Sequence, residues 1–322
     1  MNKKIGNIIR IVVSLSLLSF LIYRNKDNFE SIIDKLKDLN VTFLVIAVLL
    51  YTLALACIPL RWGILLKAHN YYISGSFLLQ SAFIGFFYNN LLPTSIGGDF
   101  YRVYDLYKNK NVPINENISA VVMERVIGNI TGITYFIFSF AFGIFGYLTR
   151  GTKIGLAISL FVILFFFTLL FRPRLFKIHV LLARYRIFSK IRPKLKSFHQ
   201  ILVSYRYKIK HLSISFFYSL LLQLIFMTSH YFVSLSLGLD LKFYMFIFAV
   251  PFASLAASIP ISIGGIGIRE NAIVFAVMSF GVVESQATLF SFIILFIILF
   301  NGLLGGIVYL FKNIFYRSRG II

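Results

Sequence analysis

Two glycine-rich segments of the same pattern stand out among the residues that could bind a ligand. Both read Pro-x-Ser-Ile-Gly-Gly-x-x-x-Arg, first from Pro93 to Arg102 and again from Pro260 to Arg269. A Gly-Gly pair can open a helix with unpaired backbone N–H groups. An arginine one turn further lies near that end, so the helix dipole and the guanidinium can face one anion, such as a phosphate. The candidate ligand-binding residues are therefore Gly97, Gly98, Arg102, Gly264, Gly265 and Arg269.

Charged residues near these segments extend the candidate site. Glu124 and Arg125 are adjacent in a mostly apolar stretch, while Asp99 and Glu270 lie within or beside the repeats. A charge at bilayer depth costs about 2.5–3.5 kcal/mol on insertion scales, so such residues usually serve a function. We expect Asp99, Glu124 and Glu270 to balance the arginines or to accept a proton. The alternative is a tight turn whose arginine pairs with Asp99, Asp105 or a membrane phosphate.

The elements that position these residues are predicted to lie in a membrane. Hydrophobic residues make up 59% of the 322 residues and charged residues only 13%, with a mean hydropathy of +0.85. This composition predicts an all-α polytopic membrane protein. Residues 5–23 form a weaker apolar stretch, which we interpret as an uncleaved anchor because no small-x-small cleavage site follows. The stretches long enough to cross about 30 Å of hydrocarbon are 42–60, 129–148, 154–171, 212–237 and 286–311.

Two further apolar segments, 72–92 and 243–259, run directly into the two glycine-rich repeats. The first of them is interrupted by Gly75, Gly85 and two asparagines. A helix that breaks at membrane depth is tolerated where its irregular backbone is buried in protein or lines a watery cavity. In transporters, such breaks at corresponding places in two halves point to the substrate site. We therefore expect each segment to enter the membrane and return on the same side.

Basic residues set the expected orientation. Between Arg172 and Lys210 the chain carries twelve lysines and arginines and no acidic residue, which places this loop in the cytoplasm. Both termini are basic too, so the number of crossings before and after the loop must be even. That count gives six spanning helices and two re-entrant or broken helices in one membrane domain covering 1–322. The expected inverted repeat has one copy at about 1–170 and a second at about 211–312, joined by the cytoplasmic loop 172–210.

The net charge of +21 would ordinarily suggest a nucleic-acid partner, but here much of the excess lies in that single loop. Its basic residues alternate with apolar ones, a pattern typical of an interfacial helix on anionic lipid. The alternative is that the charges only fix the topology. We expect a membrane and an anionic lipid as partners, no nucleic acid, and both termini in the cytoplasm, in the plasma membrane of a prokaryote.

The ordered motifs resemble a known family. Gly98-Asp99-x-x-Arg102 after Leu-Leu-Pro93, then Glu124-Arg125, then the second repeat up to Glu270, look like those of the lysylphosphatidylglycerol synthase transmembrane region, or flippase-like domain, family. The resemblance covers roughly residues 5–312. It implies a polytopic fold that, fused to a synthase domain, moves aminoacylated phospholipid between leaflets. By position it suggests Arg102, Glu124, Arg125 and Glu270 as the polar lining.

This chain departs from the family pattern at two places. Many relatives have an acidic residue shortly after the Glu-Arg pair, where this chain has Gly128 and Asn129. They also have a proline before the second Gly-Gly, where it has Ile263. No soluble stretch approaches the roughly 100 residues that a catalytic domain needs, so we do not expect the chain to make lysylphosphatidylglycerol.

Two functional hypotheses remain. The first is a lipid translocase that moves a phospholipid or a polyprenyl-phosphate-linked lipid between leaflets. The second is a membrane enzyme or accessory subunit in headgroup modification or polyprenyl-linked glycosyl transfer, with Asp99, Glu124 or Glu270 as base. No metal-ligand, paired-cysteine or nucleotide-binding motif occurs, so we expect no cofactor. A separate glycosyltransferase or lipid synthase would be the expected protein partner, and the oligomeric state is left open.

Overall fold

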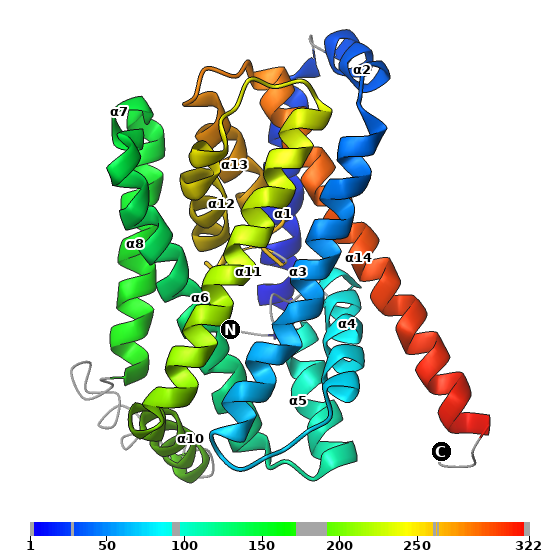
Figure 1. The fold of residues 1–322 in the computed structure, drawn as a ribbon, viewed down its shortest axis with the longest axis vertical. Coiled ribbons are helices and arrows are strands. Elements are labelled where there is room, and N and C mark those ends of the chain that lie inside the picture. Colours follow the sequence, from blue (N-terminus) through cyan, green and yellow to red (C-terminus); the bar gives the residue numbers. More distant parts are fainter. Residues whose placement is uncertain are drawn as a thin grey trace.

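The computed structural model describes residues 3–26, 29–91, 97–171, 192–259, 262 and 264–318, and every regular element in these ranges is helical. The helices form an elongated bundle (Figure 1). The chain order is α1 (Lys3–Arg24), α2 (Phe29–Lys37), α3 (Val41–Lys67), α4 (Gly75–Leu91), α5 (Gly97–Lys110), α6 (Ile114–Ser139), α7 (Ile144–Tyr147), α8 (Arg150–Phe171), α10 (Arg192–Ser204), α11 (Ile209–Ser236), α12 (Phe243–Ala257), α13 (Ile268–Met278) and α14 (Glu284–Ser318), with short 3-10 turns at Phe140–Phe142 (η2) and Tyr205–Tyr207 (η4).

Four helices of the described chain are long and apolar enough to cross a membrane: α3, α6 with η2, α11 and α14. The shortest of them, α3, has 27 residues, and at 1.5 Å per residue it exceeds the roughly 30 Å of hydrocarbon. The expectation of a multi-pass, all-helical membrane protein is thus confirmed, while the count of six spans remains a prediction.

The predicted span 129–148 was wrong at both ends. Helix α6 begins at Ile114 and ends at Ser139. Its first two turns carry polar residues that hydropathy assigned to a loop, yet Asn117 there is fully buried and donates to the carbonyl of Val103 on α5. Tertiary packing therefore extends this helix beyond its apolar part. Glu124 and Arg125 consequently lie inside the helix rather than at its beginning.

Both interrupted segments form helical hairpins. Helix α4 runs from one end of the bundle to its middle, and α5 returns beside it toward the same end (Figure 1). Helices α12 and α13 do the same from the opposite end (Figure 1). Each segment thus reverses direction inside the bundle, while its entry into a membrane and return on the same side remain a prediction. Residues 92–96 and most of 260–263, which include Pro93, Ser95 and Pro260, lie outside the described residues, as does 172–191 of the basic loop.

Glycines let these hairpins pack closely. A Cβ at Gly98 would overlap the backbone carbonyl of Gly85, so α5 lies directly against α4. On the other face of α4, a Cβ at Gly305 would overlap the carbonyl of Phe83, which shows how closely α14 approaches. Small residues of this kind allow helix backbones to approach inside a membrane. They fix the position of the α4–α5 hairpin between α6 and α14.

Candidate functional site

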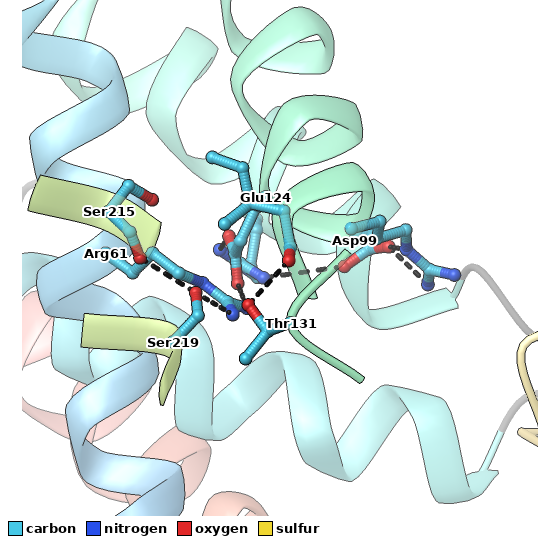
Figure 2. Close-up of polar contacts among 9 residues, drawn as sticks. Arg61, Asp99, Glu124, Thr131, Ser215 and Ser219 are labelled. Carbon is cyan, nitrogen blue, oxygen red and sulfur yellow. Dashed lines mark hydrogen bonds and ion pairs between the residues drawn. The ribbon is translucent and has the colours of Figure 1, made fainter. Parts of the chain in front are cut away.

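Glu124 of α6 lies between two arginines from different helices. Its Oε2 accepts from Arg102 on α5 at 2.6 Å, and its Oε1 accepts from Arg61 on α3 at 2.9 Å. The side chain of Glu124 is 5% exposed and that of Arg102 6%. Because a buried carboxylate is tolerated only when paired, the two guanidinium groups compensate its burial. Figure 2 shows Glu124 between Arg61 and the neighbouring Asp99.

Asp99 continues this chain of charges. It lies in the first turn of α5, where Oδ1 is 3.5 Å from Arg102 and Oδ2 accepts from Arg125 Nε at 2.7 Å. The guanidinium of Arg102 also lies 4.2 Å from the ring centroid of Trp62, within the range of a cation–π contact. Arg102 is therefore enclosed by Asp99, Glu124 and Trp62.

At its other end the chain reaches α11, where Arg61 donates to the hydroxyl of Ser219 at 2.9 Å (Figure 2). This chain of side-chain contacts links α11, α3, α6 and α5. In order, its members are Ser219, Arg61, Glu124, Arg102, Asp99 and Arg125. Three arginines face two carboxylates, so the described network has an excess of one positive charge. Arg125 is the most accessible of them, with 50% of its side chain exposed.

The second glycine-rich segment is built differently. Gly264, Gly265 and Gly267 have φ values of +55°, +80° and +86°, the left-handed region that glycine adopts without strain. This conformation interrupts the helix between α12 and α13. Glu270 then caps α13, because its Oε2 accepts from the backbone N–H of Gly267 at 2.6 Å. Its Oε1 accepts from Arg269 at 3.1 Å.

The end of α4 and the turn before α13 meet at one cavity of about 650 Å³, which we call the central cavity. A Cβ added to Gly264 would lie 3.5 Å from the backbone carbonyl of Asn89, at the end of α4, so the ends of both hairpins are in contact. Arg125 and Arg269 both line this cavity. No carboxylate is among its described lining residues. The other polar side chains that line it are Tyr51, Asn89, Asn90, Asn129, Gln223, His230, Ser254 and Ser258.

Apolar side chains from α3, α8, α12 and α14 complete the lining, including Leu55, Val162, Val250 and Ile294. The cavity therefore offers cationic and amide donors beside an apolar wall. Such an arrangement suits an amphiphile with an anionic group. Gln223 adds an uncommitted donor, because its buried Nε2 has no hydrogen-bond partner among the described residues.

The structure separates the candidate residues into three groups. Arg125, Arg269 and Gly264 line the cavity. Arg102, Asp99, Glu124 and Glu270 lie in the ion pairs that hold or neighbour those two arginines. Gly97, Gly98 and Gly265 are buried backbone positions, and the latter two have no space for a side chain.

Asp105 does not pair with an arginine of the repeat, contrary to one alternative considered from the sequence. It accepts from Lys312 of α14 at 2.8 Å, and the side chains of both are less than 10% exposed. Asp105 lies six residues beyond Asp99 on α5, toward the end of the bundle at which α4 begins (Figure 1). This pair therefore ties the α4–α5 hairpin to α14.

Sequence reasoning missed Arg61, Gln223 and Tyr51. Arg61 is an arginine within a long apolar stretch, but the predicted span 42–60 ended one residue before it. Helix α3 continues to Lys67, so Arg61 lies inside the helix. Extending the predicted span past Leu60 would have included it. Gln223 and Tyr51 carry no comparable signal, because single polar residues in apolar segments are common.

No group of three histidine, cysteine, aspartate or glutamate side chains suited to a metal occurs among the residues that the structure describes. His230, in the last two turns of α11, donates from Nδ1 to the carbonyl of Phe226 at 2.7 Å.

Comparison with known proteins agrees with this architecture. The model of the lysylphosphatidylglycerol synthase TM region matches residues 7–306. The chain belongs to this family. It is 27% identical over 285 residues to UPF0104 membrane protein PH1989 of Pyrococcus horikoshii, an alignment that covers 81% of this chain and 83% of the relative.

Two proteins of Methanocaldococcus jannaschii are also similar. UPF0104 membrane protein MJ1078 is 29% identical over 199 residues, which is 59% of this chain and 78% of that protein. MJ1595 is 29% identical over 141 residues, 44% of this chain and 40% of that protein. No solved structure matches the chain. The resemblance inferred from the ordered motifs is thus confirmed over nearly the whole sequence.

Proposed function

We propose that this protein is a lipid translocase that moves an anionic phospholipid or a polyprenyl-phosphate-linked lipid between leaflets. The main observation behind the proposal is the central cavity, where the end of α4 meets the turn before α13. Arg125 and Arg269 line this cavity, and its described lining contains no carboxylate. A lipid phosphate would be held by charge-assisted hydrogen bonds from these guanidinium groups. The apolar wall would contact the glycerol or the first methylenes.

Opposed hairpins support movement through this cavity. The α4–α5 hairpin begins at one end of the bundle and the α12–α13 hairpin at the other, and their ends touch through Gly264 and Asn89. Transporters with inverted repeats place the substrate at such a junction of broken helices, and rocking of one half against the other exposes it alternately. The membership of this family, whose model is described as a TM region of a lipid synthase, is consistent with a lipid as substrate.

The ion-pair chain would position the arginines rather than bind the lipid. Asp99 pairs with Arg125, and Glu270 pairs with Arg269. Such pairing lowers the cost of keeping a guanidinium in the membrane. A guanidinium carries five N–H donors, more than one carboxylate needs. Replacing either arginine should therefore reduce lipid movement more than stability.

Reconstitution tests this proposal. The purified protein in liposomes should redistribute a fluorescent anionic phospholipid between leaflets faster than protein-free liposomes. Arg125→Gln and Arg269→Gln should each abolish the gain. Arg150→Gln, which changes an exposed arginine outside the cavity, is the matched control and should retain it.

Mass spectrometry of the recovered lipid distinguishes transport from catalysis. A translocase leaves the lipid mass unchanged. A mass shift that requires Glu124 or Glu270 would instead identify a membrane enzyme and overturn the proposal.

A further inference from the structure

A second hollow, of about 530 Å³, lies between α6, α8, α10, η4 and α11. Its lining is almost entirely apolar and includes Met123, Ile127, Phe171, Leu212 and Phe216. We call it the lateral groove. Its volume falls within the roughly 300–1,000 Å³ of ligand sites in proteins. Several residues at its edge are strongly exposed, such as Ile209 at 69% and Phe217 at 64%, so the groove opens to the surroundings of the bundle.

The lateral groove adjoins the central cavity. Phe167 of α8 lines both hollows, so its ring lies at the boundary between them. Helix α11 makes the same connection. Phe216 lines the groove and Gln223, seven residues or about two turns further along the same face, lines the cavity. One helix face thus leads from the groove to the cationic site.

The edge of the lateral groove is basic. Arg206 of η4 lines it and is exposed, with its guanidinium 4.4 Å from the ring centroid of Tyr207. Lys208 and Lys210 follow at the beginning of α11, and the sequence from 192 to 239 contains no carboxylate. An apolar groove with a cation at its edge complements an acyl chain that carries an anionic headgroup. A zwitterionic headgroup would gain less from this edge.

We propose that the lateral groove binds an acyl chain of an anionic phospholipid with its phosphate at Arg206, and that Phe167 separates this lipid from the central cavity. The groove is then the entrance through which substrate reaches Arg125 and Arg269. Its passage past Phe167 rests on the proposed translocase function, whereas binding in the groove does not.

Photo-crosslinking tests the binding. The whole protein in nanodiscs is irradiated with phosphatidylglycerol that carries a diazirine in one acyl chain, and the labelled peptides are mapped by mass spectrometry. We expect labels on groove residues such as Phe171 and Phe216, and less labelling with phosphatidylcholine of the same chains. Arg206→Gln should lower the phosphatidylglycerol labelling about fivefold, while Arg150→Gln, an exposed arginine at the beginning of α8 that does not line the groove, should not.

A second pair of variants fills the groove without altering charge. Ser213→Trp places a large side chain at an exposed lining position, and Ile214→Trp places it at the adjacent exposed position outside the lining. Only the first should prevent labelling. Labels of equal strength with both lipids, insensitivity to Arg206→Gln, or labels confined to other surfaces would each overturn the groove assignment.

Phe167 is tested by transport. Phe167→Trp should slow leaflet exchange of phosphatidylglycerol in liposomes while the groove is still labelled. Phe167→Ala should exchange the lipid at the wild-type rate or faster. Phe161→Trp on the same helix, at a strongly exposed position that lines neither hollow, is the control. Groove labelling without any leaflet exchange by the wild type would refute translocation and keep the lipid site. Leaflet exchange without groove labelling would refute the lateral entrance alone.

Discussion

Arg102 donates to Glu124 at 2.6 Å while its guanidinium lies against the ring of Trp62, so the arginine of the first glycine-rich repeat is enclosed inside the bundle. The arginine of the second repeat, Arg269, instead lines the central cavity. Two residues at the same position of one sequence pattern therefore have different surroundings. Arg102 of the first repeat does not line this cavity. Arg125 of the neighbouring helix α6 lines it instead.

Arg102→Gln should destabilise the protein strongly. Breaking a buried ion pair leaves the other charge uncompensated, which costs about 3–5 kcal/mol. We expect a lower midpoint of thermal unfolding in detergent and a reduced yield of monodisperse protein. Arg125→Gln, whose side chain is half exposed, should change the midpoint little. Equal midpoints for Arg102→Gln and the wild type would show that Arg102 does not support the fold.

Gly98→Ala should separate α5 from α4. The new Cβ would overlap the carbonyl of Gly85 and the side chain of Asn89 on α4. The backbones of α4 and α5 cannot move apart without disturbing the hairpin. Overpacking of this kind typically costs about 1–3 kcal/mol. Gly75→Ala, at the beginning of α4 with nothing within 4 Å of the new Cβ, should be neutral. Thermal unfolding of the two variants side by side measures the difference.

The membrane architecture was predictable because hydropathy and basic loops depend on local composition. The four long apolar helices and the interruptions before Gly97 and at Gly264 follow from patterns within single segments, and the family follows from the order of the motifs along the chain. Helix ends were less accurate. Asn117 of α6 is buried and donates a hydrogen bond to the carbonyl of Val103 on α5. The residues around Asn117 in the sequence do not indicate this contact.

The chemistry of the site was only partly predictable. The sequence indicated which residues carry charge, but helix packing determines which of them pair. Glu124 pairs with Arg61, 63 residues away, and Asp105 pairs with Lys312, 207 residues away. Pairs this far apart in the sequence cannot be recognised from local patterns. The same reason explains why the cavity lining from α3 and α11 was missed.

The orientation of the bundle remains a prediction that labelling can test. Single cysteines replacing Asn2, Ser197 or Ser318, in a chain without the native cysteine, should react with an impermeant maleimide only after the cytoplasmic face is opened. Cysteines replacing Asp38, directly after α2, or Asp240, between α11 and α12, should react in intact cells, because α2 and the α11–α12 connection lie at the end of the bundle opposite α10 (Figure 1). Labelling of the Asn2→Cys variant from outside would exclude the even number of crossings inferred from the basic residues.

His69, in the turn after α3, should make stability fall in mild acid. Burial and the neighbouring Lys208 lower the pKa of its imidazole below 6.5, with Glu116 opposing and His211 adding to the shift. The unfolded chain then binds more protons below about pH 6.5, so the folded state loses stability as pH falls through that value toward the folded pKa. His69→Phe keeps the edge-on ring contact with Tyr205 and removes the proton. Its unfolding midpoint should depend less on pH than that of the wild type.

Gln223→Glu should weaken anionic lipid movement without unfolding the protein. The change is nearly isosteric and puts a carboxylate beside a cavity lined by Arg125 and Arg269, where it would compete with a lipid phosphate for their charge. Gln200→Glu, on the exposed side of α10, adds the same charge outside the cavity and is the matched control. Leaflet exchange of fluorescent phosphatidylglycerol should fall about tenfold or more for the first variant only, the effect of losing one charge-assisted contact. A rate equal to that of the control would mean that the lipid phosphate does not pass through this cavity.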